Sequence, residues 1–147
     1  MKILQIFLVV STVAFSCDSE DDMSTAGIDN MVMDMPPDNT DQNGMGTFTS
    51  YAHNLAGKAI LLTNDAGKRV VRLEDFTMTS GPDVYVFVSK SNNYSQANVI
   101  EVAKLTSGYT DSNINFDFDS SGFTSDYKFV LVYCIQYNSL FGFAELE

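Results

Sequence analysis

The sequence is poor in the residues on which most catalytic sites depend. It contains one histidine, His53, and two cysteines, Cys17 and Cys134. A lone histidine in a polar run is more often a surface residue than a general base, and one histidine with one cysteine does not complete a four-ligand zinc site. The chain also lacks a glycine-rich phosphate loop and a serine nucleophile elbow. These absences favour a protein that is not an enzyme and that holds no metal.

Basic residues are also scarce. Eight Lys and Arg face 19 Asp and Glu, which gives a formal net charge of −11. No basic patch is present of the kind that binds a phosphate backbone, so nucleic acid is not an expected partner. Asp117 and Asp119 share one face of a predicted strand. We expect both to end in solvent, and a weak Ca²⁺ contact that includes Asp126 is the alternative.

No apolar run is long enough to span a bilayer, which takes about 20 residues. Lys2, an apolar run over 3–10 and mixed small residues over 11–16 have instead the pattern of a secretory signal. Residues 14–17, Ala-Phe-Ser-Cys, resemble a bacterial lipobox, although Leu is usual at the first position and a small residue where Phe15 stands. The resemblance implies a signal peptide over 1–16, cleavage before Cys17 and a lipid on its sulfur. An ordinary cleavage site nearby, or a short uncleaved anchor, is the alternative.

Residues 17–47 are predicted to form a disordered acidic stalk, because Asp, Ser, Asn, Gly, Pro and Met bury too little apolar surface to offset the entropy of ordering. The acidic cluster over 18–22 resembles the export tag of surface lipoproteins of the Bacteroidetes, which implies an outer-membrane, surface-exposed protein attached through its lipid. Met31, Met33 and Met35 alternate, and thioethers suit Cu(I). Compositional drift is the simpler explanation, so copper binding is not expected.

Residues 48–147 are predicted to form one all-β domain, a sandwich or barrel of seven or eight strands, because short β-prone runs alternate with turn residues at regular spacing. Asn64 to Gly67 has the composition of a hairpin turn. Alternation over 69–76 makes Val71, Leu73 and Phe76 core candidates and turns Arg72 and Glu74 outward. Strands are expected at the following positions: 57–63, 69–76, 84–89, 99–105, 114–118, 127–137 and 140–146.

The run over 127–146 contains Cys134, which has no disulfide partner if Cys17 carries a lipid. Residues 129–135 are uninterrupted strand formers, which predicts a strand buried on both faces. Counting in twos places Val130, Val132 and Cys134 on one face, and the following residues on the other: Phe129, Leu131, Tyr133, Ile135 and Tyr137. The local residues favour an inert core cysteine, since free Cys is among the most buried residue types.

Several motifs together resemble the DM-thirteen domain, often called an electron-transfer domain. They are Gly81-Pro82-Asp83 before an apolar strand, Cys134, and Phe141-Gly142 seven residues later, and the resemblance runs from Phe48 to Leu146. It implies that Cys134 is a redox residue, either as a bare thiol or through a prosthetic group such as haem, and that a redox partner protein exists. Tyr133 departs from the family, which often has Trp there.

The sequence therefore predicts a cell-envelope lipoprotein with a redox or electron-transfer role through Cys134. The alternative is a binding or structural β-sandwich in which Cys134 only packs. The redox role rests on the resemblance alone.

Overall fold

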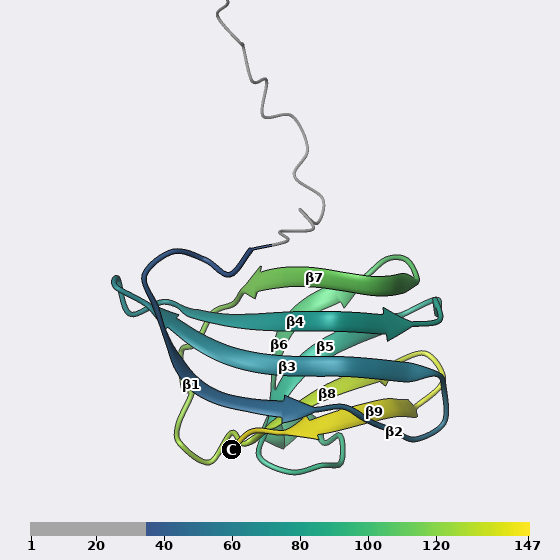
Figure 1. The fold of residues 1–147 in the computed structure, drawn as a ribbon. Coiled ribbons are helices and arrows are strands. Elements are labelled where there is room, and N and C mark those ends of the chain that lie inside the picture. The colour runs from purple at the N-terminus through teal and green to yellow at the C-terminus, as the bar shows by residue number, and fades with distance from the viewer. Residues whose placement is uncertain (1–34) are drawn as a thin grey trace, which may run out of the picture.

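The computed structural model describes residues 35–147 (Figure 1). Nine strands form two antiparallel sheets that pack face to face, which confirms the predicted all-β sandwich. The first sheet has the order β1-β3-β4-β7 and the second the order β2-β9-β8-β5-β6. The predicted signal peptide, Cys17, the acidic cluster over 18–22, Met31 and Met33 lie outside the described residues. The elements are β1 Thr40–Thr47, β2 Thr49–Ser50, β3 Leu55–Asn64, β4 Arg69–Met78, β5 Val84–Ser89, the short 3₁₀ helix η1 Gln96–Asn98, β6 Val99–Leu105, β7 Tyr109–Asp117, β8 Phe129–Cys134 and β9 Ser139–Glu145.

The hairpin between β3 and β4 turns where the sequence predicts it. The Asn64 side-chain oxygen accepts hydrogen bonds from the backbone N–H groups of Ala66 at 3.1 Å and Lys68 at 2.8 Å. Gly67 has φ of +76°, a conformation that glycine adopts without steric penalty. Local side-chain chemistry therefore sets this turn.

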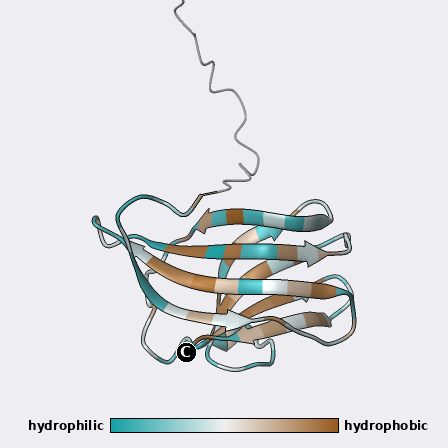
Figure 2. Cartoon of the chain, viewed as in Figure 1, coloured by the Kyte–Doolittle hydropathy of each residue, from teal (hydrophilic) through white to brown (hydrophobic). Residues whose placement is uncertain are grey.

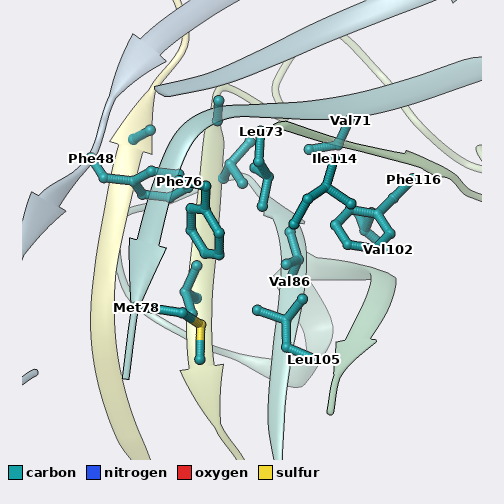
Figure 3. Close-up of a cluster of buried hydrophobic side chains, with 14 of the residues drawn as sticks. Phe48, Val71, Leu73, Phe76, Met78, Val86, Val102, Leu105, Ile114 and Phe116 are labelled. Carbon is teal, nitrogen blue, oxygen red and sulfur yellow. The ribbon is translucent and has the colours of Figure 1, made fainter. Parts of the chain in front are cut away.

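The core lies between the sheets and follows the period of two along each strand. Figure 2 shows bands of apolar and polar residues along the strands of the nearer sheet. Val71, Leu73 and Phe76, the predicted core residues of β4, are each 0% exposed. Phe76 keeps to the inner face because a bulge interrupts the pairing between Leu73 and Phe76. Figure 3 shows side chains from both sheets, among them Leu73, Phe76, Val86 and Leu105, meeting in this interior.

Arg72 is outward-facing as predicted, but it is not exposed. The residue is 2% exposed, because the strands on either side place Ile60 and Asn115 beside it. Its Nε donates to Glu74 Oε1 at 2.6 Å and its Nη1 donates to Asn115 Oδ1 at 3.0 Å. The buried guanidinium is thus paired and hydrogen-bonded, which is the condition under which a buried charge is tolerated.

Strand β1 lies within 17–47, where composition predicts a disordered stalk. Its residues are mostly polar or glycine, and it is held by its backbone ladder to β3 rather than by apolar side chains. A Cβ on Gly46 would lie 2.0 Å from the Glu145 carbonyl oxygen, so a glycine is needed where β1 meets β9. Residues 40–47 therefore belong to the folded domain. Within residues 35–147, no helix has the length and apolar character needed to cross a membrane.

Candidate functional site

Cys134 is the last residue of β8 and is 1% exposed. It lies opposite Val84 of β5 and Ser139 of β9. Val130, Val132 and Cys134 belong to the core between the sheets, as counting in twos predicts. Within the described residues Cys134 is a free, buried cysteine.

The predicted strand ends earlier than expected. Ile135 and Tyr137, predicted to follow Tyr133 on the outer face, lie in the turn between β8 and β9 and are 37% and 67% exposed. The turn closes through a hydrogen bond from the Asn138 N–H to the Ile135 carbonyl, with Asn138 at φ of +47°. A polar Asn in the left-handed region ends the strand although its neighbours are β-prone.

The outer face of β8 is covered by aromatic side chains. Tyr94, from the loop before η1, stacks on Tyr133 with ring centroids 4.1 Å apart and planes inclined by 10°. Burial raises the pKa of Tyr133, and the neighbouring Tyr94 and Cys134 groups raise it further. Phe87, Leu131 and Tyr133 form a buried cluster on this outer face, separate from the core between the sheets. The strand is therefore buried on both faces, as predicted.

Gly81 and Asp83 hold the turn before β5 against the Cys134 end of the sheet. A Cβ on Gly81 would lie 2.5 Å from Val84 Cγ2 and 3.3 Å from the Phe141 ring, so a larger residue would push both away. The Asp83 carbonyl accepts a hydrogen bond from the Ile135 N–H at 3.0 Å. The Asp83 carboxylate accepts one from Lys104 Nζ at 2.7 Å, and this bond raises the pKa of Lys104. The turn is thereby fixed to the residue that follows Cys134.

Phe141 and Gly142 form the second part of this arrangement. The pairing of β8 with β9 shifts by one residue at this point, and the Phe141 ring is 3% exposed in the core. A Cβ on Gly142 would lie 2.3 Å from the Thr49 carbonyl oxygen and 2.7 Å from Leu55 Cδ2. Glycine is needed here because β2 and β3 approach the backbone closely. Gly81, Asp83 and Phe141 thus meet at the end of the sandwich that holds Cys134, and Gly142 follows Phe141 on β9.

His53 also lies at this end, although nothing in its sequence context links it to Cys134. Its ring packs against Phe141 with centroids 4.0 Å apart and planes inclined by 32°, and its Nε2 lies 3.3 Å from the hydroxyl oxygen of Ser139. Ser139 is the residue paired with Cys134. Residues 51–54, which carry His53, are all exposed. The long-range pairing of β2 with β9, and a hydrogen bond from the Tyr51 N–H to the Phe141 carbonyl at 2.8 Å, bring this segment here.

The surroundings of the Cys134 sulfur do not fit a haem. Core side chains enclose the sulfur, and no hydrogen bond to it is present among residues 35–147. A cavity of about 380 Å³ is lined by residues at the other end of β8, including Tyr127 and Lys128. We therefore derive no step through a haem.

The acidic residues considered for Ca²⁺ are not brought together. Asp117 pairs with Lys68 at 2.5 Å, Asp126 pairs with Lys90 at 3.8 Å, and Asp119 accepts hydrogen bonds from Ser121. Within the described part of the chain, no cluster of three or more His, Cys, Asp or Glu residues is arranged to hold a metal ion.

A family model described as Electron transfer DM13 matches residues 47–146, which is nearly the whole of the folded domain. Comparisons with curated proteins and with solved structures give no match.

Proposed function

Because the chain belongs to the Electron transfer DM13 family, we propose that its domain serves electron transfer and that Cys134 is the redox-active group. The main support for this proposal is that Gly81, Asp83 and Phe141 lie close together at the Cys134 end of β8. These residues fix the position of one thiol in a domain whose core is otherwise large enough to fold without it.

The proposed reaction is thiol–disulfide exchange with a disulfide on a partner protein. The Cys134 sulfur forms a bond to one sulfur of the partner, and the bond between the two partner sulfurs breaks. The proton of the Cys134 thiol passes to the departing sulfur, which leaves as a thiol. Cys134 is oxidised to a mixed disulfide and the departing sulfur is reduced. A thiol of a second partner then attacks the partner sulfur of the mixed disulfide, its proton passes to the Cys134 sulfur, and Cys134 leaves as a thiol while a disulfide joins the two partner sulfurs.

Access to the sulfur requires a local opening, since Cys134 is 1% exposed. Residues 51–54 are the segment that we propose to open. They are exposed. The Tyr51 N–H donates to the Phe141 carbonyl at 2.8 Å, and the His53 ring packs against Phe141 and contacts Ser139. Segments with few buried contacts open at a lower free energy than the whole domain.

The location of the protein is part of the same proposal. We propose that the chain is a cell-envelope lipoprotein, attached through a lipid on Cys17 and displayed at the outer membrane, which would supply the oxidising setting where disulfides persist. Expression of the wild type and of Cys17→Ala with a labelled fatty acid tests this point. Label on both chains, or on neither, would contradict lipidation at Cys17.

The reactivity of Cys134 tests the redox proposal. In a Cys17→Ser background, the native full chain is mixed with an aromatic disulfide whose released thiolate absorbs visible light. If the sulfur were reached only by global unfolding, a stability of at least about 5 kcal/mol would slow the reaction several-thousand-fold relative to the unfolded chain. We expect a faster reaction, with a rate that changes little in low urea because a local opening exposes little surface.

Substitutions at His53 identify the opening segment. His53→Ala removes a ring stack, worth roughly 0.5–1.5 kcal/mol, so the reaction should be about two- to tenfold faster. His53→Phe is the matched control, because it keeps a ring against Phe141 and should react at nearly the wild-type rate. An equal rate in His53→Ala and wild type would refute an opening at 51–54.

A binding or structural module in which Cys134 only packs is the second candidate. The observation that favours it is the burial of the sulfur without a hydrogen-bond partner among the described residues. In that case the reaction rate would fall with the fraction of globally unfolded protein and rise with urea as steeply as the unfolding equilibrium does. This result would overturn the redox proposal.

A further inference from the structure

A cavity of about 380 Å³ lies at the end of the sandwich opposite Cys134. Arg69 begins β4 and Lys128 precedes β8, whereas Cys134 ends β8. The volume falls in the lower part of the usual range for small-molecule sites, roughly 300–1,000 Å³. Neither the sequence motifs nor the redox site involves this cavity.

The loop over 119–128 supplies an apolar wall. Two successive turns shape it, with hydrogen bonds from the Phe123 N–H to the Ser120 carbonyl at 2.9 Å and from the Tyr127 N–H to the Thr124 carbonyl at 3.2 Å. The Phe123 and Tyr127 rings stack with centroids 5.2 Å apart, and both line the cavity. Leu61 of β3, buried in the core, adds a further apolar surface.

Two cations line the same cavity. The Arg69 guanidinium carbon lies 4.2 Å from the centre of the Phe123 ring, a cation–π contact. A guanidinium carries five N–H donors in a planar fork that matches a carboxylate. Of these groups, Nη1 makes a long 3.4 Å contact with the Thr63 hydroxyl. Lys128 supplies the second positive charge.

The local charge is opposite to that of the whole chain. The lining contains no Asp or Glu, although the sequence has 19 acidic and only eight basic residues. Asp117, which ends β7, and Asp126 of the adjoining loop are paired with Lys68 and Lys90, and the Asp119 carboxylate of that loop accepts hydrogen bonds from Ser121. The Asn43 amide oxygen accepts a hydrogen bond from the Thr63 hydroxyl, which leaves the amide N–H groups of Asn43 as donors.

We propose that this cavity binds a small organic anion: a carboxylate carried on an aromatic or short apolar group. The carboxylate would pair with Arg69 and Lys128, and the apolar part would pack against Phe123 and Tyr127. Apolar walls with a few convergent polar groups are the usual composition of a small-molecule site. This binding is independent of the chemistry of Cys134.

Titration of the full chain, followed by amide NMR signals, tests the ligand class. Sodium benzoate should shift the signals of residue 69 and of 123–128 in a saturable manner. Benzyl alcohol, which has the ring without the charge, and inorganic phosphate, which has the charge without the ring, should each bind at least tenfold more weakly. Equal binding of benzyl alcohol would refute the role of the cations, and equal binding of phosphate would refute the role of the apolar wall.

Two substitutions with a matched control assign the residues. Arg69→Gln should weaken benzoate binding about tenfold or more, because a hydrogen-bonded charge pair is lost. Lys58→Gln removes one positive charge from an exposed site, paired with Asp75 at 3.7 Å, and should leave binding within about twofold. Lys128→Gln alters an exposed side chain, so it tests the cavity even if Arg69→Gln fails to fold. Unchanged binding in Lys128→Gln, or losses as large in Lys58→Gln, would overturn the proposal.

Discussion

Replacement of Cys134 by Ala and by Ser tests whether the sulfur occupies an apolar, closely packed position. The side chain is 1% exposed and lies among the core residues Val84, Val132 and Phe141. Ala removes the sulfur and leaves a small cavity, whereas Ser keeps nearly the same size and replaces the sulfur by a hydroxyl. The two substitutions therefore separate the effect of packing from that of polarity.

The expected order follows from the surroundings. Loss of one buried heavy atom, with the cavity that it leaves, should lower the free energy of unfolding by about 1–2 kcal/mol in Cys134→Ala. A buried hydroxyl without a partner is penalised by roughly 1–3 kcal/mol. Ser139, the nearest hydroxyl in the strand pairing, already contacts His53. We therefore expect Cys134→Ser to be less stable than Cys134→Ala by about 1 kcal/mol or more.

Urea unfolding followed by circular dichroism measures both variants against wild type. A difference of 1 kcal/mol corresponds to about 4–8 °C in Tm for a domain of this size. Ile135→Ala is the control, because this neighbouring side chain is 37% exposed and its loss should change stability by less than about 0.5 kcal/mol. A Ser variant as stable as the Ala variant would refute the apolar surroundings that we describe.

Two further substitutions test the motif and the loop. Gly142→Ala should lower the free energy of unfolding by roughly 2–3 kcal/mol, because the added Cβ meets Thr49 and Leu55; urea unfolding measures it, and a loss below about 0.5 kcal/mol contradicts the close approach. The Asp119 carboxyl group should have a pKa below its usual value of 3.8, because the Ser121 hydroxyl and N–H donate hydrogen bonds to the carboxylate. A lowered folded pKa means that this contribution to stability is present above the unfolded pKa and is lost as pH falls through the folded one. In Ser121→Ala the carboxyl signal in NMR should titrate at higher pH, and an unchanged midpoint contradicts the cause that we assign.

The strands and several turns follow from local sequence. Asn64 and Gly67 determine their hairpin through their own side-chain and backbone preferences, and period two assigns Val130, Val132 and Cys134 to one face. The exposed fraction of a residue, in contrast, also depends on side chains from strands that are distant in the sequence. Arg72 faces outward, as its position in the strand requires, but its burial depends on Ile60 and Asn115 in neighbouring strands.

The site depends on pairings between distant parts of the chain. The motif residues around Cys134 are recognisable in the sequence, but the place of His53 follows from the pairing of β2 with β9, whose members are more than 90 residues apart. The sequence does not predict strand β1, because its glycine and polar residues show no alternation of apolar positions. The strand is held by its backbone hydrogen bonds to β3. The cavity likewise needs β1, β4 and the loop over 119–128 to meet.

The order of strands in the second sheet affects the risk of aggregation while the chain folds. Strand β9 lies between β2 and β8, so β8 has an unpaired edge until β9 joins it. Strand β8 is among the most apolar segments of the domain, with five of its six residues buried. An open apolar edge is a template for aggregation. While the domain folds, a chain in which Ser139–Glu145 has not yet paired with β8 presents this edge to other molecules, and holding the chain unfolded until β9 can pair would protect it.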